Sequence, residues 1–280
     1  MSDRRTMLTE IFKDTQRYCM ENAYLKQAIA DSIANTKIYT ADTRPILDEG
    51  GRDGIIRVTR HRTYEAAIKL HGEYPDRRIA VLNFASATDP GGGVTRGASA
   101  QEECLCRCST LYPVLDTPQL KEAYYTPNRS KDNLHDDTCI YTPDIVICKT
   151  DEDMPKRTDS FVTVDVISCA APNLRATPAN IYNHEGKIIL HITKDELYEL
   201  HYERAMHILH AAHSSGADMV VLGAFGCGAF RNDPSVVAAA YRDVIERYRH
   251  MFDIIEFAVY CRDDDTANFT AFSRAMERLI

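Results

Sequence analysis

The feature that most constrains this chain is a glycine-rich loop between an apolar run and a helical pattern. The apolar run at 79–85 predicts a buried strand, and it leads into DPGGGVTRGASAQEE at positions 89–103. Glycines lack side chains, so a ligand can approach their backbone. The helix that follows begins with unpaired N–H groups and a positive dipole end, which favour phosphate. Carboxylates beside such a cradle indicate acid/base chemistry on a phosphorylated sugar.

A second loop of the same kind is GAFGCGAF at positions 223–230, after the apolar run at 219–224. Gly226 and Gly228 permit backbone conformations that are closed to other residues. Two such loops after strands of one α/β sheet can form the walls of its ligand-binding crevice. Phe230 either packs against a sugar or base, or belongs to the core. The loop lacks the G-x-x-x-x-G-K-[ST] pattern of a Walker A nucleotide site.

Two adjacent glutamates follow the first loop. Ser99 and Glu102 have the spacing of a capping box, which predicts that Glu102 bonds back to the amide of Ser99. Glu103 lies about 100° further around the helix axis, so the two carboxylates point differently. We interpret Glu103 as the acid/base group and Glu102 as a cap that also touches the ligand. The alternative is that both are ordinary acidic residues of a first helical turn.

Strand-like runs alternate with helical patterns along the chain, which predicts an α/β sheet covered by helices on both faces. We predict that the first 75 residues form a mainly helical extension and that residues 76–280 form the core. A boundary near residue 35 is the alternative, and the lack of a Gly/Ser linker predicts that both parts pack as one unit. Predicted strands are 37–39, 55–58, 79–85, 161–169, 219–224 and 254–261, with 139–141 and 145–148 as a hairpin or two short strands. Predicted helices are 6–33, 63–71, 101–111, 118–125, 195–214, 234–248 and 266–279, and 128–137 is an exposed loop.

The charge and the cysteine count limit the partners. The 280 residues carry a net charge of −8 and no basic patch large enough for duplex DNA. The sequence contains neither an apolar run of transmembrane length nor the hydrophobic core of a signal peptide, so we expect no membrane association. Nine cysteines, several of them within strand-like runs, indicate reduced core thiols of a cytoplasmic protein.

One cluster, the three cysteines at 104–108, resembles a metal site, but we predict that it binds no metal. On a helix, Cys104 and Cys108 share one face while Cys106 lies roughly opposite, so three thiolates cannot converge on one ion.

Asn173, just after a predicted strand, either faces the crevice or shapes the turn. Four histidines share one predicted helix and are interpreted as surface or hydrogen-bonded side chains: His201, His207, His210 and His213.

The combination of GGG…QEE, AAPN at 170–173 and GAFGCGAF resembles the microbial-type poly(ADP-ribose) glycohydrolases, which are enzymes of the macrodomain fold. The resemblance covers most of the chain. It implies a mixed twisted sheet flanked by helices, with a mainly helical N-terminal extension. It also implies hydrolysis of the ribose–ribose O-glycosidic bonds of poly(ADP-ribose), with release of ADP-ribose.

The resemblance also assigns roles to individual residues. The first loop would clamp the diphosphate and the proximal ribose, and the second loop would hold the other side of the diphosphate. Glu103 matches the catalytic glutamate, Glu102 the one that holds the scissile ribose, and Phe230 the aromatic that positions the ribose. The implied substrate-binding residues are Gly91, Gly92, Gly93, Val94, Gln101, Gly226, Cys227, Gly228, Ala229 and Phe230.

The implied partners are poly(ADP-ribose) or ADP-ribosylated proteins as substrate and ADP-ribose as product. The implied enzyme is a monomer that reverses ADP-ribosylation, as in the DNA damage response, and uses no cofactor or metal. Two other functions stay open. One is a reader that binds ADP-ribose without cleaving it, although binding alone does not need paired glutamates. The other is a hydrolase of a different ADP-ribose derivative, such as protein-linked mono-ADP-ribose.

Overall fold

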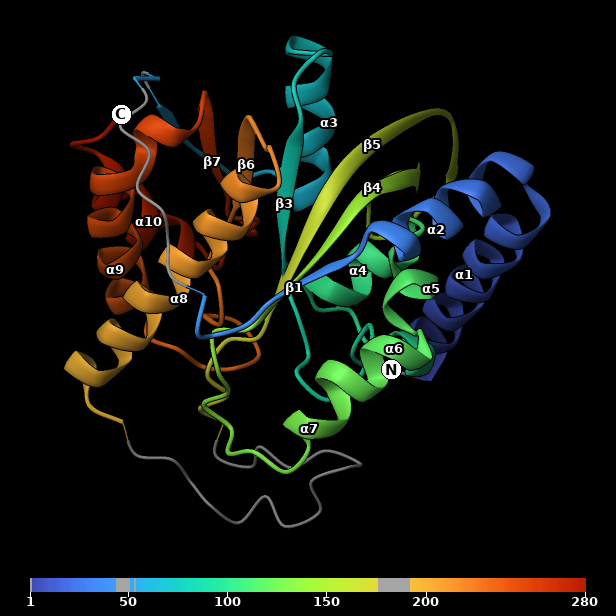
Figure 1. The fold of residues 1–280 in the computed structure, drawn as a ribbon, viewed down its shortest axis with the longest axis horizontal. Coiled ribbons are helices and arrows are strands. Elements are labelled where there is room, and N and C mark those ends of the chain that lie inside the picture. Colours follow the sequence, from blue (N-terminus) through green and yellow to red (C-terminus); the bar gives the residue numbers. More distant parts are fainter. Residues whose placement is uncertain (1, 44–50, 53, 176–191) are drawn as a thin grey trace.

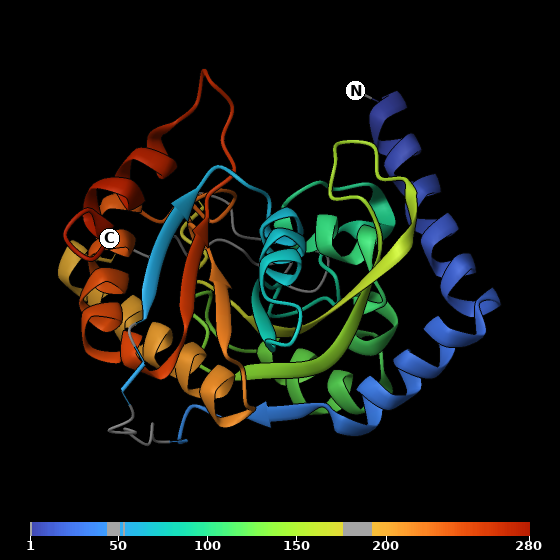
Figure 2. The same ribbon diagram turned by 90° about the horizontal axis from the view of Figure 1, so that it is seen from above.

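A seven-stranded mixed sheet lies between two layers of helices (Figures 1 and 2). The computed structural model describes residues 2–43, 51–52, 54–175 and 192–280. The strand order is β1-β4-β5-β3-β6-β7-β2, in which β4 runs antiparallel to β1 and β5 and the other pairs are parallel. The predicted mixed α/β fold is therefore confirmed. The strands are β1 Lys37–Tyr39, β2 Ile55–Thr59, β3 Ile79–Phe84, β4 Cys139–Lys149, β5 Arg157–Cys169, β6 Met219–Leu222 and β7 Ile254–Ala258.

Each face of the sheet has its own helical layer (Figure 1). One layer contains α8 Lys194–Ser214, α9 Pro234–Tyr248 and α10 Ala267–Met276. The other contains α1 Ser2–Glu21, α2 Ala23–Asn35, α3 Thr63–Glu73, α4 Gln101–Cys108 and α5 Leu111–Leu115, followed by the short α6 Pro118–Leu120 and α7 Thr126–Asn128. Within the described ranges, no helix is long and apolar enough to cross a lipid bilayer.

The central strand β3 shows why its sequence is continuously apolar. Ile79 and Val81 pack into the layer of α1–α5, whereas Ala80 and Leu82 pack into the layer of α8–α10. Successive side chains of a strand point to opposite faces, so a strand covered on both sides needs apolar residues throughout. Since β3, β5, β6 and β7 are parallel, their C-terminal ends meet at one edge of the sheet. A ligand site is expected at that edge.

The prediction of one helix over 6–33 is wrong. Asn22 interrupts it, and its side-chain oxygen accepts hydrogen bonds from the amides of Tyr24 and Leu25, which caps α2. The predicted hairpin or strand pair at 139–148 is also wrong, because β4 is one strand with an irregularity between Thr142 and Ile145. The other predicted strands, and the predicted helices at 63–71, 195–214, 234–248 and 266–279, are present with bounds that differ by a few residues.

The proposed boundary at residue 75 stays a prediction. The helical pair ends at Asn35, near the alternative boundary. Residues between these two positions contribute β1 and β2 to the same sheet as the rest of the chain, and α3 to the same helical layer as α4.

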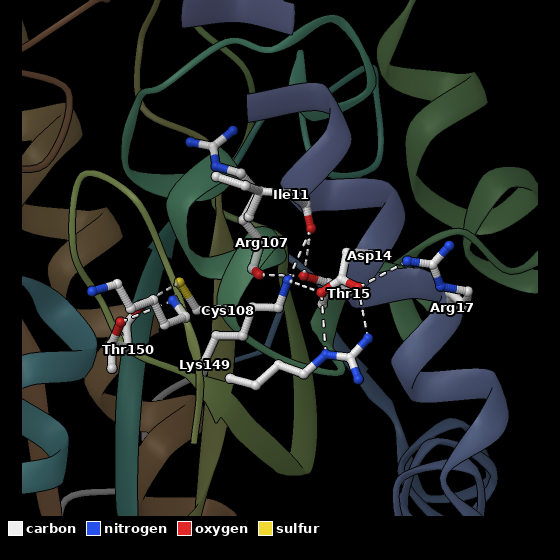
Figure 3. A network of polar contacts seen from close by, with 10 residues as sticks. Ile11, Asp14, Thr15, Arg17, Arg107, Cys108, Lys149 and Thr150 are labelled. Atoms are coloured by element: carbon white, nitrogen blue, oxygen red, sulfur yellow. Dashed lines mark hydrogen bonds and ion pairs between the residues drawn. The ribbon is translucent and has the colours of Figure 1, made fainter. Parts of the chain in front are cut away.

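A polar network ties α1 to the sheet and to α4 (Figure 3). Asp14 accepts hydrogen bonds from Arg157 at 2.6 Å and from the buried Lys149 at 2.8 Å. Thr15 donates its hydroxyl to the carbonyl of Arg107 at 2.6 Å. Arg157 first, and then Lys149, hold the pKa of Asp14 well below its usual range. The α1 helix is therefore anchored by a buried cation as well as by apolar packing.

We expect Asp14→Asn to lower the free energy of unfolding by about 2 kcal/mol at pH 7, because the buried Lys149 ammonium loses its carboxylate partner and keeps only the carbonyl of Ile11 among the residues that the structure describes. Because the pKa of Asp14 is lower in the folded protein than in the unfolded chain, its ionised carboxylate stabilises the fold at pH values above the unfolded-state pKa of about 3.9. This contribution to the free energy of unfolding is lost as the pH falls toward the folded-state pKa. The free energy of unfolding, measured with urea from about pH 3 to about pH 8, should therefore differ between variant and wild type by a constant amount down to about pH 4 and by less below it.

The control is Glu10→Gln, which removes an exposed pair with Lys13 on the same helix and should cost at most about 0.5 kcal/mol. Equal losses in the two variants, or a difference that widens in acid, would contradict this account of α1 docking.

Candidate active site

A cavity of about 640 Å³ opens where the parallel strands end. Phe84 of β3, Asn173 after β5, Ala224 after β6 and Ala258 of β7 all line it. Both glycine loops contribute to its wall, as do Arg4 of α1 and other residues. The structure therefore brings together two loops that are more than 100 residues apart in the sequence, as the sequence analysis predicted.

The first loop needs glycine for two separate reasons. Gly91 and Gly92 have φ of +65° and +58°, a region that residues with side chains rarely adopt. A Cβ on Gly92 would also lie 2.7 Å from Oε1 of Glu103 and 3.0 Å from Oε2 of Glu102. The bare backbone of this loop thus lets both carboxylates approach the cavity wall.

The two glutamates occupy different environments. Glu102 is buried and accepts hydrogen bonds from the amide of Ser86 at 2.7 Å and from the side-chain amide of Asn83 at 3.3 Å. Burial, and then the neighbouring Glu103, raise the pKa of Glu102 well above its usual range. Glu103 accepts a hydrogen bond from the amide of Gly93 at 2.8 Å through Oε1. Among the described residues, its buried Oε2 has no hydrogen-bond partner, and Glu103 is one of the residues that line the cavity.

The predicted capping box at the start of α4 is wrong. The residue at the N-cap is Ala100, which makes no side-chain cap, and the carboxylate of Glu102 bonds to Ser86 instead of Ser99. Glu102 bonds to the amide of Ser86 because β3 and α4 pack against each other, a contact that a local sequence pattern does not reveal. Glu102 is therefore tied to the end of the central strand.

Gln101 lines the cavity, and both ends of its side chain are already bonded. Its oxygen accepts a hydrogen bond from the amide of Phe84 at 2.8 Å. Its nitrogen donates to the carbonyl of Leu82 at 2.7 Å and to the hydroxyl of Thr63 at 3.0 Å. Gln101 thus fixes the beginning of α4 to β3, and its role in substrate binding stays a prediction.

The conformation of the second loop also requires one glycine. Gly226 has φ of +76°, and a Cβ there would lie 2.8 Å from the side chains of both Ala171 and Asn232. Gly228, Ala229 and Phe230 face the cavity.

Three predicted site residues are not among those that line the cavity: Gly91, Val94 and Cys227. Val94 is fully buried in the apolar cluster of α1–α5, and Cys227 is partly buried against the cluster of α8–α10. They shape the two loops, and their roles in substrate binding stay predictions.

Phe230 lines the cavity and packs partly against the core, and its contact with a sugar or base stays a prediction. The guanidinium of Arg175 lies 5.6 Å from its ring centroid and donates to the side-chain oxygen of Asn173 at 3.0 Å. Asn173 therefore faces the crevice, as one of its two interpretations predicted.

Basic side chains surround the cavity, and no sequence pattern predicted them. They come from segments spread over the whole chain, so no local motif announces them, although the protein as a whole is acidic. Arg129 and Lys131, together with His135, lie on the segment 128–137, which the sequence predicted only as an exposed loop. The basic residues that line the cavity are Arg4, Arg62, Arg96, Arg129, Lys131, Arg175 and Arg262.

Cys106 and Cys108 are packing residues of the core, as predicted, whereas Cys104 is only partly buried and lines the cavity. Burial raises the pKa of the thiols of Cys104, Cys106 and Cys108, and the thiol of Cys108 lies 3.3 Å from the carbonyl of Thr150. All nine cysteines are free thiols. In the parts of the chain that the structure describes, no group of His, Cys, Asp or Glu is arranged to hold a metal ion.

Comparisons with known proteins agree on one family. The sequence model of the family "Microbial-type PARG, catalytic domain", where PARG denotes poly(ADP-ribose) glycohydrolase, matches residues 9–150. The solved structure of PARG from Deinococcus radiodurans in complex with ADP-ribose is 32% identical over 90% of this chain and 98% of its own, with a TM-score of 0.75. PARG from Thermomonospora curvata is 29% identical over 98% and 100%, with a TM-score of 0.82. The same enzyme bound to the inhibitor ADP-HPD is 30% identical over 98% and 99%, with a TM-score of 0.78. A search of curated proteins gave no match.

We expect Gly92→Ala to destabilise the protein by about 2–4 kcal/mol, because it combines an unfavourable φ with a clash against both carboxylates. The matched control is Gly216→Ala, where φ is +86° but a Cβ would meet nothing within 4 Å. That control should show only the backbone cost, about 1–2 kcal/mol. Chemical denaturation of the two variants gives the comparison, and equal losses would show that the loop does not press on the glutamates.

Proposed function

This chain belongs to the microbial-type poly(ADP-ribose) glycohydrolases, and we propose that its cavity binds ADP-ribose units of the polymer and cleaves the ribose–ribose bond with Glu103. As a member of this family it is a glycosidase that hydrolyses poly(ADP-ribose). The observation that carries the assignment of Glu103 is the buried, unpartnered Oε2 beside the glycine loop. A general acid must reach its proton acceptor directly, and this atom has no competing partner among the described residues.

The two loops are proposed to hold the diphosphate from opposite sides. Gly92 and Gly93 on one wall, and Gly226 and Gly228 on the other, present backbone without side chains. Backbone amides and basic side chains bind phosphate locally, even in a protein of net charge −8. Phe230, which lines the same cavity, is proposed to position the terminal ribose.

The proposed reaction needs one acid/base group. Glu103 protonates the leaving ribose oxygen, the substrate diphosphate stabilises the developing oxocarbenium ion, and the Glu103 carboxylate then activates water. Most glycosidases place a second carboxylate where this reaction uses the phosphate of the substrate. Glu102 holds the scissile ribose. This proposed chemistry uses no metal or cofactor.

The proposal extends to the setting of the reaction. The enzyme is proposed to act as a monomer in the cytoplasm, on poly(ADP-ribose) or ADP-ribosylated proteins, and to reverse the modification in the DNA damage response. The nine free thiols support a reducing compartment. The net charge of −8 supports a protein that binds neither duplex DNA nor a membrane surface.

We expect Glu103→Gln to lower kcat on poly(ADP-ribose) about 10²–10⁴-fold, because the amide cannot transfer the proton. The affinity for ADP-ribose should stay within about 3-fold of the wild-type value, since the side chain keeps its shape. Release of ADP-ribose from polymer measures the first quantity, and calorimetric titration measures the second. The control is Glu122→Gln, an exposed residue.

Near-full turnover by Glu103→Gln would refute the mechanism. A wild-type protein that binds polymer and leaves its length unchanged would be a reader. Faster release from a mono-ADP-ribosylated protein than from polymer would indicate a hydrolase of another ADP-ribose derivative.

A further inference from the structure

Helix α8 brings two buried polar side chains behind the cavity, one turn apart. His201 and Arg204 are fully buried on this helix, which lies in the layer with α9 and α10 (Figure 1). Neither is among the residues that line the cavity, and the proposed mechanism uses neither. Each of them bonds to a segment that forms part of the cavity wall.

His201 reaches the second glycine loop through Asn232. The side-chain nitrogen of Asn232 donates to the carbonyl of Gly226 at 3.1 Å and to that of Phe230 at 3.3 Å. It also donates to the carbonyl of Pro172, after β5, at 2.7 Å. One buried amide thus joins the second glycine loop to the segment after β5, a strand that β3 separates from β6 in the sheet.

The bonding pattern fixes the tautomer of His201. The nitrogen of Asn232 faces carbonyls, so its oxygen faces Nε2 of His201, at 2.8 Å. An oxygen can only accept, so Nε2 must carry the proton. Burial lowers the pKa of His201 to about 4, and among the described residues Nδ1 has no partner. His201 is therefore a neutral donor that keeps the amide of Asn232 turned toward the loop.

Arg204 secures the opposite part of the wall. Its guanidinium donates to the carboxylate of Asp137 and to the carbonyl of Ala170, both at 2.8 Å. It also donates to the carbonyls of Leu134 and His135, both at 3.2 Å. The segment around His135, which lines the cavity, is thus bound to the end of β5.

We propose that His201 and Asn232 are positioning residues that hold the second glycine loop in its ligand-binding conformation before the ligand arrives. This inference rests on the proposed function, because it takes the loop to be one side of the diphosphate site. A loop that is already ordered loses no further conformational entropy when the ligand binds. Loss of this order therefore weakens the binding of the ground state and of the transition state equally. The expected signature is a raised Kd and KM with little change in kcat.

The test compares three variants of α8. His201→Phe keeps a ring but leaves the oxygen of Asn232 without its donor, and we expect Kd for ADP-ribose and KM for polymer to rise about 10-fold. His201→Gln keeps a donor near the same position and should restore both to within about 3-fold of wild type. His207→Phe is the matched control: His207 is buried on the same helix, and neither of its ring nitrogens has a partner among the described residues.

Unchanged Kd and KM in His201→Phe would overturn the proposal, as would equal losses in His207→Phe, or a His201→Gln variant as weak as His201→Phe. These outcomes leave the proposed function intact if the wild type binds ADP-ribose and cleaves polymer. A wild type that does neither overturns both.

A measurement on the wild type alone keeps the proposal testable if His201→Phe does not fold. The amides of Cys227 and Asn232 donate within the loop, to the carbonyls of Ala224 and Gly226, both at 3.1 Å. In a loop that is already ordered, both amides should be protected from hydrogen exchange without ADP-ribose. Protection that appears only after ADP-ribose is added would overturn the proposal.

Discussion

The site depends on hydrogen bonds between two carboxylates of α4 and the main chain that follows β3. Glu102 accepts from the amide of Ser86, and Glu103 accepts from the amide of Gly93. The amide of Ser86 precedes the three glycines at 91–93 and that of Gly93 is the last of them, so the loop conformation and the positions of the acids depend on each other. Gly92 lies between the carboxylates with φ of +58°, a conformation that a side chain would both strain and obstruct. The loop that is proposed to hold phosphate therefore also aims the acid.

Helices on the two sides of the sheet support the two loops, each from its own side. A Cβ on Gly97 would overlap the carbonyl of Arg5, so the start of α1 lies directly against the turn that ends the loop. Thr15 bonds the same helix to the end of α4. On the other side of the sheet, His201 and Asn232 join the second loop to the end of β5. The N-terminal helical pair is accordingly part of the framework of the site and not an appendage.

The sequence predicted the elements whose signals are local. Continuous apolar runs identified the buried strands, and glycines after two of them identified the loops that share the cavity. Glu102 and Glu103 were placed correctly on the following helix. The hydrogen-bond partner of Glu102 was not, because Ser86 is 16 residues away in the sequence and approaches Glu102 only in the fold.

Contacts between distant segments account for the remaining differences. The break at Asn22 was hidden because apolar residues continue at helical spacing on both sides of it. The basic side chains of the cavity come from scattered segments, and the polar ties of α8 depend on where that helix packs. Such contacts exist only after the sheet has formed, so the pattern of the sequence alone does not encode them visibly.

The most direct test of the account is a crystal structure of the protein with bound ADP-ribose. The account predicts that the diphosphate touches the backbone of both loops, at 91–94 and 226–229, and that Glu103 is the carboxylate nearest to the anomeric carbon of the terminal ribose. A diphosphate that contacts only one loop, or a terminal ribose that lies away from Glu103, would contradict it.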